Sequence, residues 1–520
     1  MRLHDFFDHH AREHPERPCL VFGDRTLTYA EAAAQSHKLA RALLGCGLAP
    51  GERFGLLAKN SLEYLLFFLA GSKTGIVPVP LNYRLAPPEL AYIVNDARAR
   101  VLVARGECVA AFDAARASCP ELKTCVALDA PPCASWLDYR DWIGGESSAP
   151  LASDPARPED DLYQMYTSGT TGRPKGAVLS QRSVIEHLFQ QFTMLELPPR
   201  ERVLLVAPMY HAAAALTALG AMVAGSTAVI HEDFSPQAVV RALSEDGITR
   251  TTLVPVMIQA CLLAVPDVAQ RRYDALQLIV YGASPIAADV LRRALEVFRC
   301  DFAQGYGMTE TTAALTFLSR EDHRRALAGR PELLLSAGRP LPGTEVRVVR
   351  PDGSDAAPGE VGEIVGRGAQ LMRGYWNLPE ASAEALRGGW MHTGDAGSLD
   401  ADGYLYLQDR VKDMIVSGGE NVYPREVENV LFSHPAVADV AVIGVPDPKW
   451  GEAVKAIVVL RPGASATPEA LLAHCRGRLG GYKCPRSVDF VEALPRNPSG
   501  KVLKKDLREK YWAGQSRRIS

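Results

Sequence analysis

The chain has 520 residues, which is too long for one ordinary hydrophobic core, so we expect two or more domains. Its composition, 47% hydrophobic and 22% charged, is typical of a soluble globular protein. Because 57 basic residues nearly balance 60 acidic ones, the net charge is only -3, and the chain has no general field that would collect nucleic acid or anionic lipid. Any recognition of anions must therefore be local.

Three further features exclude other classes of protein. The ten cysteines form no CxxC pair and have no closely spaced partner histidines, so we expect reduced, packed thiols and no zinc site. The first residues, MRLHDFFDHHAREHPERP, carry acids and histidines where a signal peptide would need a basic end and then an apolar run. Residues 212–230 lack charge but are rich in Ala and Gly, which predicts a buried helix leading into a strand. We expect a cytoplasmic protein without a transmembrane segment.

Helical patterns of roughly ten residues alternate with short β-branched runs through most of the chain. In chain order the helix and strand pairs are 63–75 with 76–82, 110–117 with 123–128, 236–247 with 249–256, and 288–298 with 299–307. This alternation predicts an α/β fold with parallel, doubly wound sheets, in which ligands bind at the carboxyl ends of the strands.

The sequence pattern changes after about residue 339 to short strand-like runs separated by Gly and Pro. This pattern predicts a small β-rich subdomain. From residue 424 onward the pattern reads helix, strand, strand, helix, strand and basic helix. We therefore predict a large N-terminal domain over residues 1–410 and a small α+β C-terminal domain over residues 411–520.

A run of glycines and hydroxyl side chains, YTSGTTGRPKG at residues 166–176, follows the apolar residues LYQM. Glycines leave backbone N–H groups unshielded, hydroxyls add donors, and Lys175 adds a positive charge, so the run can cradle phosphate oxygens. It is not a Walker loop, because Lys175 is followed by Gly176 instead of Ser or Thr.

Two weaker motifs follow. Residues 304–311, QGYGMTET, place Tyr306 between glycines, where its ring can stack on a planar group, and Glu310 offers the hard oxygens that suit Mg²⁺. Residues 392–395, HTGD, are followed fifteen residues after Asp395 by Arg410, and an acid of this kind can grip ribose hydroxyls.

These motifs occur in this order together with the GGEN turn at residues 418–421 and a carboxy-terminal PRNPSGK at residues 495–501. In this combination the sequence resembles the adenylate-forming superfamily of acyl-CoA synthetases, non-ribosomal peptide adenylation domains and luciferases, from the amino terminus to about residue 510. The resemblance implies an AMP-binding adenylation domain over residues 1–410, a mobile C-terminal domain over residues 411–520, and the use of ATP, Mg²⁺ and coenzyme A.

The resemblance also assigns residues to the nucleotide. Those expected to bind ATP or AMP are Thr167, Ser168, Gly169, Thr170, Thr171, Gly172, Lys175, Gly282, Ala283, Ser284, Gln304, Gly305, Tyr306, Gly307, Asp395 and Arg410. The 167–175 loop would hold the β- and γ-phosphates, adenine would lie between Tyr306 and residues 282–284, and Asp395 with Arg410 would bind the ribose.

The catalytic assignments follow from the same resemblance. Thr309 would meet the α-phosphate, Glu310 would hold Mg²⁺, and Lys501 would bridge the acyl carboxylate and the α-phosphate. Physical chemistry supports this arrangement, because a carboxylate that attacks a phosphate is an anion meeting an anion, and catalysis must come from cations and oriented N–H groups. No protein nucleophile is needed.

For thioester formation the family rotates its small domain, and the resemblance places the hinge at Lys412. The turn at residues 417–421 would then line a pantetheine tunnel. The residues expected to contact coenzyme A are Gly418, Gly419, Glu420, Trp450, Arg84 and Lys483, with Arg486 as a further candidate. The alternatives are that Trp450 is a plain core residue and that the Arg and Lys side chains are simply solvated.

The acyl group is expected behind His211, which resembles the ring that gates the substrate path in the family; the alternative is a core histidine. The expected lining is small and apolar, which suggests a roomy, uncharged cavity: His211, Ala212, Ala213, Ala214, Val256, Ala313 and Ala314. Gln304 stands where malonate-activating relatives carry Arg, and Tyr210 with His211 stands where an amino-acid pocket would start with Asp. We therefore expect a fatty or aryl carboxylic acid.

The predicted function is that of an AMP-forming acyl-CoA synthetase. One alternative with the same chemistry is a free-standing ligase that loads an acyl carrier protein. Two further alternatives are a luciferase-like oxygenase, which the small apolar lining does not favour, and a non-enzymatic binding module, which Lys501 and the intact 167–175 loop argue against.

Overall fold

The structure is a computed structural model, and it describes residues 1–129, 135–152, 155–167, 173–198, 200–284, 286, 288–410, 413–417, 420–476, 478–496 and 502–513. The side chains at positions 409, 410 and 421 are outside this description.

The N-terminal part forms a five-stranded parallel sheet. In spatial order its strands are β4 (Val77–Pro80), β3 (Arg53–Leu57), β5 (Val101–Ala104), β6 (Thr124–Ala127) and β7 (Leu137–Asp138). Its helices are α2 (Tyr29–Gly45), α3 (Leu62–Thr74), α4 (Pro87–Asp96), α5 (Glu107–Asp113), η1 (Arg116–Ser118) and α6 (Tyr139–Gly144). Ser61 caps the start of α3 through its side chain, and Gly75, with φ 73°, ends the helix in the left-handed conformation that glycine adopts easily.

The second sheet has nine strands and is parallel except at its edges. In spatial order its strands are β16 (Arg339–Pro340), β15 (Thr316–Leu318), β14 (Asp301–Tyr306), β13 (Leu278–Gly282), β12 (Arg250–Leu253), β10 (Arg202–Leu205), β11 (Thr227–Ile230), β1 (Pro18–Phe22) and β2 (Arg25–Thr28). The associated helices are α1 (Leu3–Glu13), α7 (Gln181–Leu195), α8 (Ala212–Val223), α9 (Pro236–Glu245), α10 (Pro255–Ala264), η2 (Thr309–Thr311), α11 (Ala288–Phe298), α12 (Arg320–Leu327) and η3 (Pro331–Leu335).

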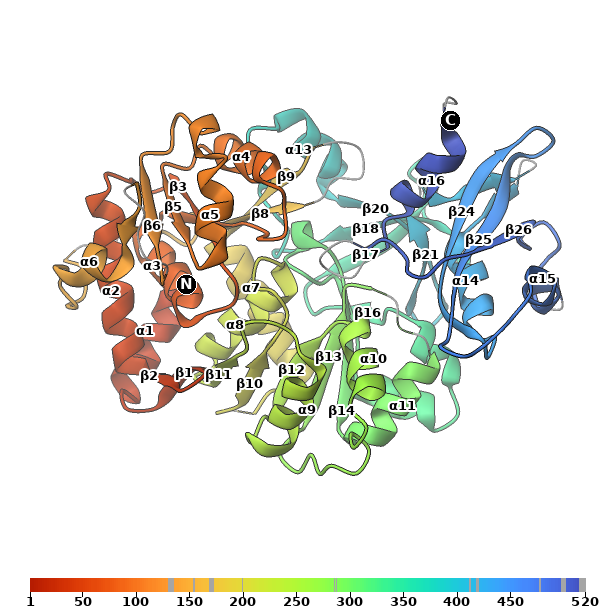
Figure 1. Cartoon of the computed structure of the whole chain (residues 1–520), viewed down its shortest axis with the longest axis horizontal. Coiled ribbons are helices and arrows are strands. Elements are labelled where there is room, and N and C mark those ends of the chain that lie inside the picture. The colour runs from red at the N-terminus through yellow and green to blue at the C-terminus, as the bar shows by residue number, and fades with distance from the viewer. Residues whose placement is uncertain are drawn as a thin grey trace.

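Helices cover both faces of this second sheet. On one face, α9 to α12 pack against it in a separate core. On the other face, α1, α7 and α8 fill a core that also includes α2 and α3 and reaches the five-stranded sheet. Figure 1 shows this layering from red to green. The prediction of doubly wound α/β sheets is confirmed.

The predicted elements match closely where their pattern is long. Residues 212–230 form α8 followed by β11, as expected, and no helix in the described part of the chain is long and apolar enough to span a membrane. The helix expected at residues 110–117 is instead α5, which starts at Glu107, followed by the short η1. The shift reflects a short, Ala-rich pattern that fixes no boundary.

Two smaller sheets are antiparallel and include the strands after residue 339 that were predicted as a β-rich subdomain. The hairpin of β8 (Asp161–Thr167) and β9 (Lys175–Ser180) is joined by β19 (Gly374–Tyr375). A four-stranded sheet consists of β17 (Glu345–Val349), β18 (Gly362–Arg367), β20 (Met391–Leu399) and β21 (Leu405–Arg410), with α13 (Pro379–Ala385) and η4 (Arg387–Gly389) between its strands in sequence.

The C-terminal module has its own core. Its elements are β22 (Ile415–Ser417), β23 (Glu420–Val422), α14 (Pro424–Phe432), β24 (Val437–Asp447), β25 (Gly451–Leu460), α15 (Pro468–Arg476), β26 (Ser487–Phe490) and α16 (Lys504–Trp512). From α14 to α16 this is the predicted order, and Figure 1 shows the module in blue. The boundary between residues 410 and 411 stays a prediction.

Three histidines in the described part of the chain have strongly lowered pKa values. Burial lowers the pKa of His187, His211 and His323 to about 4. His323 shows the neutral tautomer clearly, because its Nδ1 donates to the Ser319 carbonyl at 2.7 Å and its Nε2 accepts from the Tyr281 hydroxyl at 3.0 Å.

We therefore predict that the protein loses stability as the pH falls from 7 to 5. Between pH 6.5 and about 4 the unfolded chain binds protons that these buried histidines do not, so stability rises with pH at about 1 kcal/mol per pH unit for each histidine. Thermal unfolding measured across this range tests it. The change His323→Gln keeps an amide that can donate and accept but does not titrate, so its melting temperature must depend less steeply on pH. An unchanged slope would contradict this assignment.

Candidate active site

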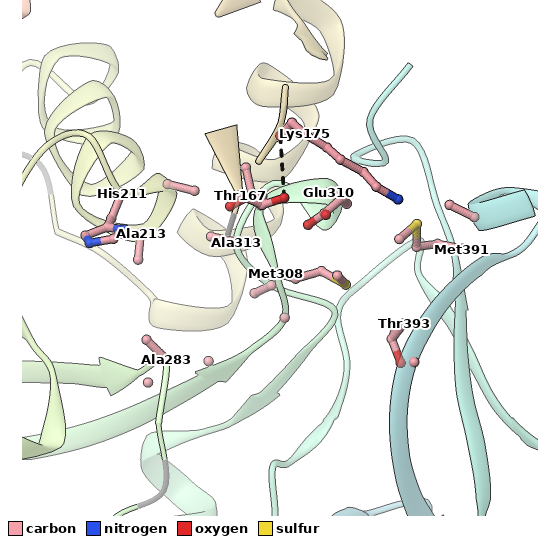
Figure 2. A pocket seen from close by; sticks show the side chains of 18 of the residues that line it. Thr167, Lys175, His211, Ala213, Ala283, Met308, Glu310, Ala313, Met391 and Thr393 are labelled. Atoms are coloured by element: carbon pink, nitrogen blue, oxygen red, sulfur yellow. Dashed lines mark hydrogen bonds between the residues drawn. The ribbon is translucent and has the colours of Figure 1, made fainter. Parts of the chain in front are cut away.

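A cavity of about 1510 Å³ opens at the carboxyl ends of β13 and β14. The hairpin β8–β9, the start of α8, strand β20 and the start of α16 also contribute to its walls. The predicted site residues that line it are Thr167, Lys175, His211, Ala212, Ala213, Ala214, Gly282, Ala283, Gly305, Gly307, Thr309, Glu310, Ala313 and Ala314. Figure 2 shows His211 and Ala213 on one side of this cavity and Lys175, Glu310 and Thr393 on the other.

Several predicted residues lie outside the described part of the chain. They are Ser168, Gly169, Thr170, Thr171, Gly172, Lys412, Gly418, Gly419 and Lys501, together with the side chain of Arg410. Their neighbours in sequence do reach the cavity, since Thr167, Lys175, Asp413 and Val502 all line it.

One end of the cavity joins a cation, a ring and a carboxylate in series. Thr167 and Lys175 pair across the hairpin, and the Thr167 hydroxyl donates to the Lys175 carbonyl at 3.5 Å. The Lys175 Nζ lies 4.9 Å from the centre of the Tyr375 ring, and the Tyr375 hydroxyl donates to Glu310 Oε1 at 2.8 Å. This end can therefore hold an anion beside Lys175 and a hard cation beside Glu310.

The residues at this end fit Mg²⁺. Glu310 is only 3% exposed, yet it lines the cavity and presents a carboxylate. Mg²⁺ in nucleotide sites is bound by one or two carboxylates plus phosphate oxygens and waters, so a single carboxylate beside a phosphate site is sufficient.

Tyr375 was not among the residues predicted from the sequence. It lies on β19, which pairs with β9, and only this pairing brings it against Lys175. The sequence around it does resemble a predicted motif. Tyr375 follows Gly374, just as Tyr306 follows Gly305.

The strand ends form a narrow floor. Gly282 and Gly305 are paired in register, and a Cβ on Gly282 would lie 2.4 Å from the Gly305 carbonyl oxygen. Nearby, the Tyr306 hydroxyl donates to Asp395 Oδ2 at 2.9 Å, although the two residues are 89 positions apart. Asp395 in turn stands opposite Arg410 in the pairing of β20 with β21. The fold therefore gathers the residues predicted to surround adenine and ribose.

Four residues of this predicted set are not among those that line the cavity: Ser284, Gln304, Tyr306 and Asp395. Gln304 is buried in β14, where it pairs with Tyr281 and Leu318. The neighbours of Tyr306 and Asp395 in the chain do line the cavity: Gly305 and Gly307 flank Tyr306, and Gly394 precedes Asp395.

The opposite wall is formed by His211 and the alanines that follow it. His211 stands at the N-cap position of α8, its ring centre 4.4 Å from that of Tyr210, and its Nε2 is buried without a hydrogen-bond partner. Burial, and then the charge of Arg84, lowers the pKa of His211 to about 4. The imidazole is therefore neutral at physiological pH and shapes the cavity without supplying charge.

Val256 requires a correction. Pro255 begins α10, and the first turn directs Val256 outward, where it is 43% exposed. Its neighbours Val254 and Met257 line the cavity in its place. The strand was predicted to run to residue 256, but β12 ends at Leu253 and α10 begins at Pro255, so the predicted side-chain direction of Val256 is wrong.

Of the described residues predicted for coenzyme A, Trp450 and Arg486 are in contact with each other, whereas Arg84, Glu420 and Lys483 have other neighbours. Trp450 is half-buried, with the Arg486 guanidinium 4.4 Å above its ring, so it is not a plain core residue. Lys483 pairs with Glu426 at 2.7 Å, Glu420 is exposed at the start of β23, and Arg84 is exposed beside the Tyr83 ring. The structure gathers no single anion site from them.

The contact of Tyr375 with Glu310 gives a testable prediction. Tyr375→Phe keeps the ring beside Lys175 but removes the hydroxyl that donates to Glu310, so pyrophosphate release should fall about ten-fold, with a higher Mg²⁺ requirement. Tyr273→Phe is the matched control, since the Tyr273 hydroxyl donates to the Val268 carbonyl and neither residue lines the cavity. A Tyr375→Phe enzyme with an unaltered Mg²⁺ dependence would remove this role.

Comparison with known proteins agrees with this geometry. The family model described as AMP-binding enzyme matches residues 7–376, and the model of the AMP-binding enzyme C-terminal domain matches residues 426–501. A feruloyl-CoA synthase of Amycolatopsis sp is 40% identical over 506 residues, covering 96% of this chain and 97% of the relative. The fatty acid–[acyl-carrier-protein] ligase ScoC of Streptomyces coeruleorubidus is 37% identical over 98% of this chain and 96% of its own.

A solved structure shares the whole architecture. The anthranilate CoA ligase AuaEII in complex with anthranoyl-AMP superimposes with a TM-score of 0.90 at 28% identity, covering 98% of this chain and 97% of that chain. The predictions of the adenylate-forming superfamily, of an AMP-forming acid–CoA ligase and of ATP, Mg²⁺ and coenzyme A are confirmed. The chain belongs to the family of AMP-binding enzymes.

Proposed function

We propose that this acyl-CoA synthetase activates a fatty or aryl carboxylic acid whose body lies against the alanines behind His211. The observation that carries the proposal is the continuity of one cavity from Lys175 and Glu310 to Ala213 and Ala313. An acid that enters it meets apolar surface along its length and the nucleotide at its carboxylate. We also propose a cytoplasmic location.

In the first half-reaction a carboxylate oxygen of the acid forms a bond to the α-phosphorus of ATP, and the bond to the bridging oxygen breaks as pyrophosphate leaves. In our proposal Lys175 balances charge on the leaving pyrophosphate and the Thr309 hydroxyl orients the α-phosphate. Glu310 would hold Mg²⁺, which supplies Lewis-acid stabilisation of phosphate charge when bound. Lys501 would hold the acyl carboxylate against the α-phosphate.

In the second half-reaction the thiol of coenzyme A gives up its proton to solvent and its sulfur forms a bond to the acyl carbon, while the bond from that carbon to the phosphate oxygen breaks and AMP leaves with the electron pair. We propose that the C-terminal module turns about Lys412 between the two steps. The presence of Asp413, Met414 and the start of α16 in the cavity wall supports this proposal, since these segments must leave before another surface of the module can face the adenylate.

An acyl carrier protein is a second candidate acceptor, because the relative ScoC, at 37% identity, is named as a ligase for an acyl carrier protein. The pantetheine arm is common to coenzyme A and a holo-carrier protein, so the same tunnel could serve either. Supplying the enzyme with each acceptor at equal concentration separates them by the rate of AMP release.

The proposed function is tested by pyrophosphate release with ATP, Mg²⁺ and a panel of aliphatic and aromatic acids, with and without coenzyme A. We expect turnover with fatty or aryl acids only when the thiol is present, yielding AMP and the acyl-CoA. Higher turnover with malonate or amino acids than with fatty or aryl acids would refute the proposed acid class. Pyrophosphate release that is unaffected by coenzyme A would favour a carrier protein as the acceptor.

Lys501→Ala should lower pyrophosphate release by about a hundred-fold or more, because it removes the cation between two anions. Thioester formation from a supplied acyl-adenylate should remain, since that step no longer joins the anions. Measuring both half-reactions with one acid is required. Equal loss of the two would contradict the role given to Lys501.

Lys412→Pro should slow thioester formation and leave adenylation largely intact, the reverse of the effect expected for Lys501→Ala. Proline fixes φ near −65° and so obstructs rotation about this residue without altering the first conformation. We expect near-normal formation of the acyl-adenylate and at least about a ten-fold slower transfer to coenzyme A. Lys412→Ala, which leaves φ free, is the matched control, and a Pro variant with unaffected overall turnover would remove the hinge.

A further inference from the structure

Strand β20 departs from regular pairing where it passes the cavity. Residues 391–392 and 396–397 pair with β18, but between these two stretches Ile364 of β18 stands alone opposite the three residues 393–395. The extra residues form a β-bulge, which leaves backbone groups without partners in the sheet and changes the direction of side chains. The bulge lies at the cavity wall, which includes His392, Thr393 and Gly394.

Side chains bond the backbone groups of this bulge. The Thr393 hydroxyl donates to the Ile364 carbonyl at 2.7 Å and accepts from the Asp395 N–H at 3.1 Å. The Gly394 N–H donates to Glu363 Oε1 at 3.3 Å. Gly394 has φ 67°, the left-handed conformation that glycine adopts easily, so the chain can turn sharply at this point. The bulge is therefore fixed to β18 by the Thr393 hydroxyl and by the Glu363 carboxylate.

The other carboxylate oxygen of Glu363 is held by the chain as well. Glu363 Oε2 accepts from His392 Nδ1 at 2.9 Å and from Arg387 Nη2 at 3.1 Å. A carboxylate accepts and does not donate, so His392 carries its proton on Nδ1 in this contact. The Glu363 side chain lines the cavity but is only 24% exposed. Since Arg387 balances its charge and both of its oxygens accept from the chain, Glu363 is suited to fixing the bulge and not to binding a ligand.

The bulge decides where the Asp395 carboxylate points. Asp395 Oδ2 accepts from the Tyr306 hydroxyl at 2.9 Å, and Asp395 stands opposite Arg410 on β21. Side chains alternate between the two faces of a strand, so a bulge that slipped by one residue would turn Asp395 to the other face. Glu363 bonds Gly394, the residue directly before Asp395, and so holds the bulge in the register that brings Asp395 to Tyr306.

We propose that Glu363 is a positioning residue for the ribose of ATP, because it fixes the bulge that presents Asp395. This inference rests on the proposed function and on the predicted contact of Asp395 with the ribose hydroxyl groups. Glu363 does not touch the nucleotide and acts through the Gly394 N–H. Its loss therefore weakens recognition of the ribose hydroxyls and leaves binding of the acid unchanged.

The test compares ATP with 2′-deoxy-ATP and 3′-deoxy-ATP in pyrophosphate release with one saturating acid. The ratio of kcat/KM for ATP to that for a deoxy nucleotide is called the ribose preference. We expect a preference of about ten-fold or more for at least one analogue in the wild-type enzyme, because a site built to bond a hydroxyl rejects a substrate that lacks it. Asp395→Ala should reduce the preference to about one.

Glu363→Ala should lower the ribose preference by about five-fold, the effect of one lost hydrogen bond. The loss should appear mainly as a higher KM for ATP, while the KM of the acid stays unchanged. Glu363→Ala combined with Asp395→Ala should lose no more than Asp395→Ala alone, because both changes act on one contact.

Two conservative variants separate the length of the side chain from its charge, and they test the same contact if Glu363→Ala does not fold. Glu363→Gln keeps an oxygen that can accept from the Gly394 N–H, so it should keep most of the ribose preference. Glu363→Asp keeps the charge beside Arg387 but is one methylene shorter and loses Gly394, so it should behave like Glu363→Ala. Glu345→Ala is the matched control, because Glu345 pairs with Arg367 at 2.7 Å in the same sheet and neither residue lines the cavity.

The outcomes separate this inference from the function beneath it. Equal loss of activity with ATP and with the deoxy nucleotides in Glu363→Ala would reduce Glu363 to a general structural role and overturn the inference. A wild-type enzyme without a ribose preference, or a preference that survives in Asp395→Ala, would overturn it too. In each of these cases ATP still supports pyrophosphate release, so the ligase stands. If no acid of the panel supports release with ATP, the proposed function fails and this inference fails with it.

Discussion

The site depends on the close approach of two strand ends, Gly282 on β13 and Gly305 on β14. A side chain on Gly282 would meet the Gly305 carbonyl oxygen at 2.4 Å, so the backbones themselves form the surface there. This leaves a flat passage between the nucleotide side, with Lys175 and Glu310, and the acyl side behind His211. In the proposed mechanism, adenylation and thioester formation both take place beside the contact of Gly282 with Gly305. The parallel register of β13 and β14 fixes the position of this contact.

Charge is distributed unevenly along the cavity. Cation and carboxylate are concentrated where phosphates are proposed to lie, and Tyr375 links them through its ring and its hydroxyl. Burial lowers the pKa of His211 to about 4, so in the proposed mechanism it does not compete with Lys501 for the acyl carboxylate. The same burial is one of the reasons for which we predict that the folded chain loses stability in acid.

The sequence predicted the doubly wound sheets and part of the cavity lining because parallel strands bring their carboxyl ends to one edge, where motifs far apart in sequence meet. It did not predict contacts that depend on pairing between distant strands. Tyr375 reaches Lys175 only because β19 joins β9, and Asp395 reaches Tyr306 from 89 positions away. The prediction for Val256 failed for a local reason, since β12 ends three residues earlier than predicted and the first turn of α10 directs the side chain outward.

Arg250 shows a different limit of sequence reasoning. Arg250, at the start of β12, is 3% exposed, and its Nε donates to Glu201, which is 49 positions away and equally buried. A buried ion pair is weak evidence for stability, because apolar residues of similar volume often serve as well. Each of these charges is costly to bury unless its partner is buried beside it, so a sequence pattern that shows the two residues separately cannot predict the pair.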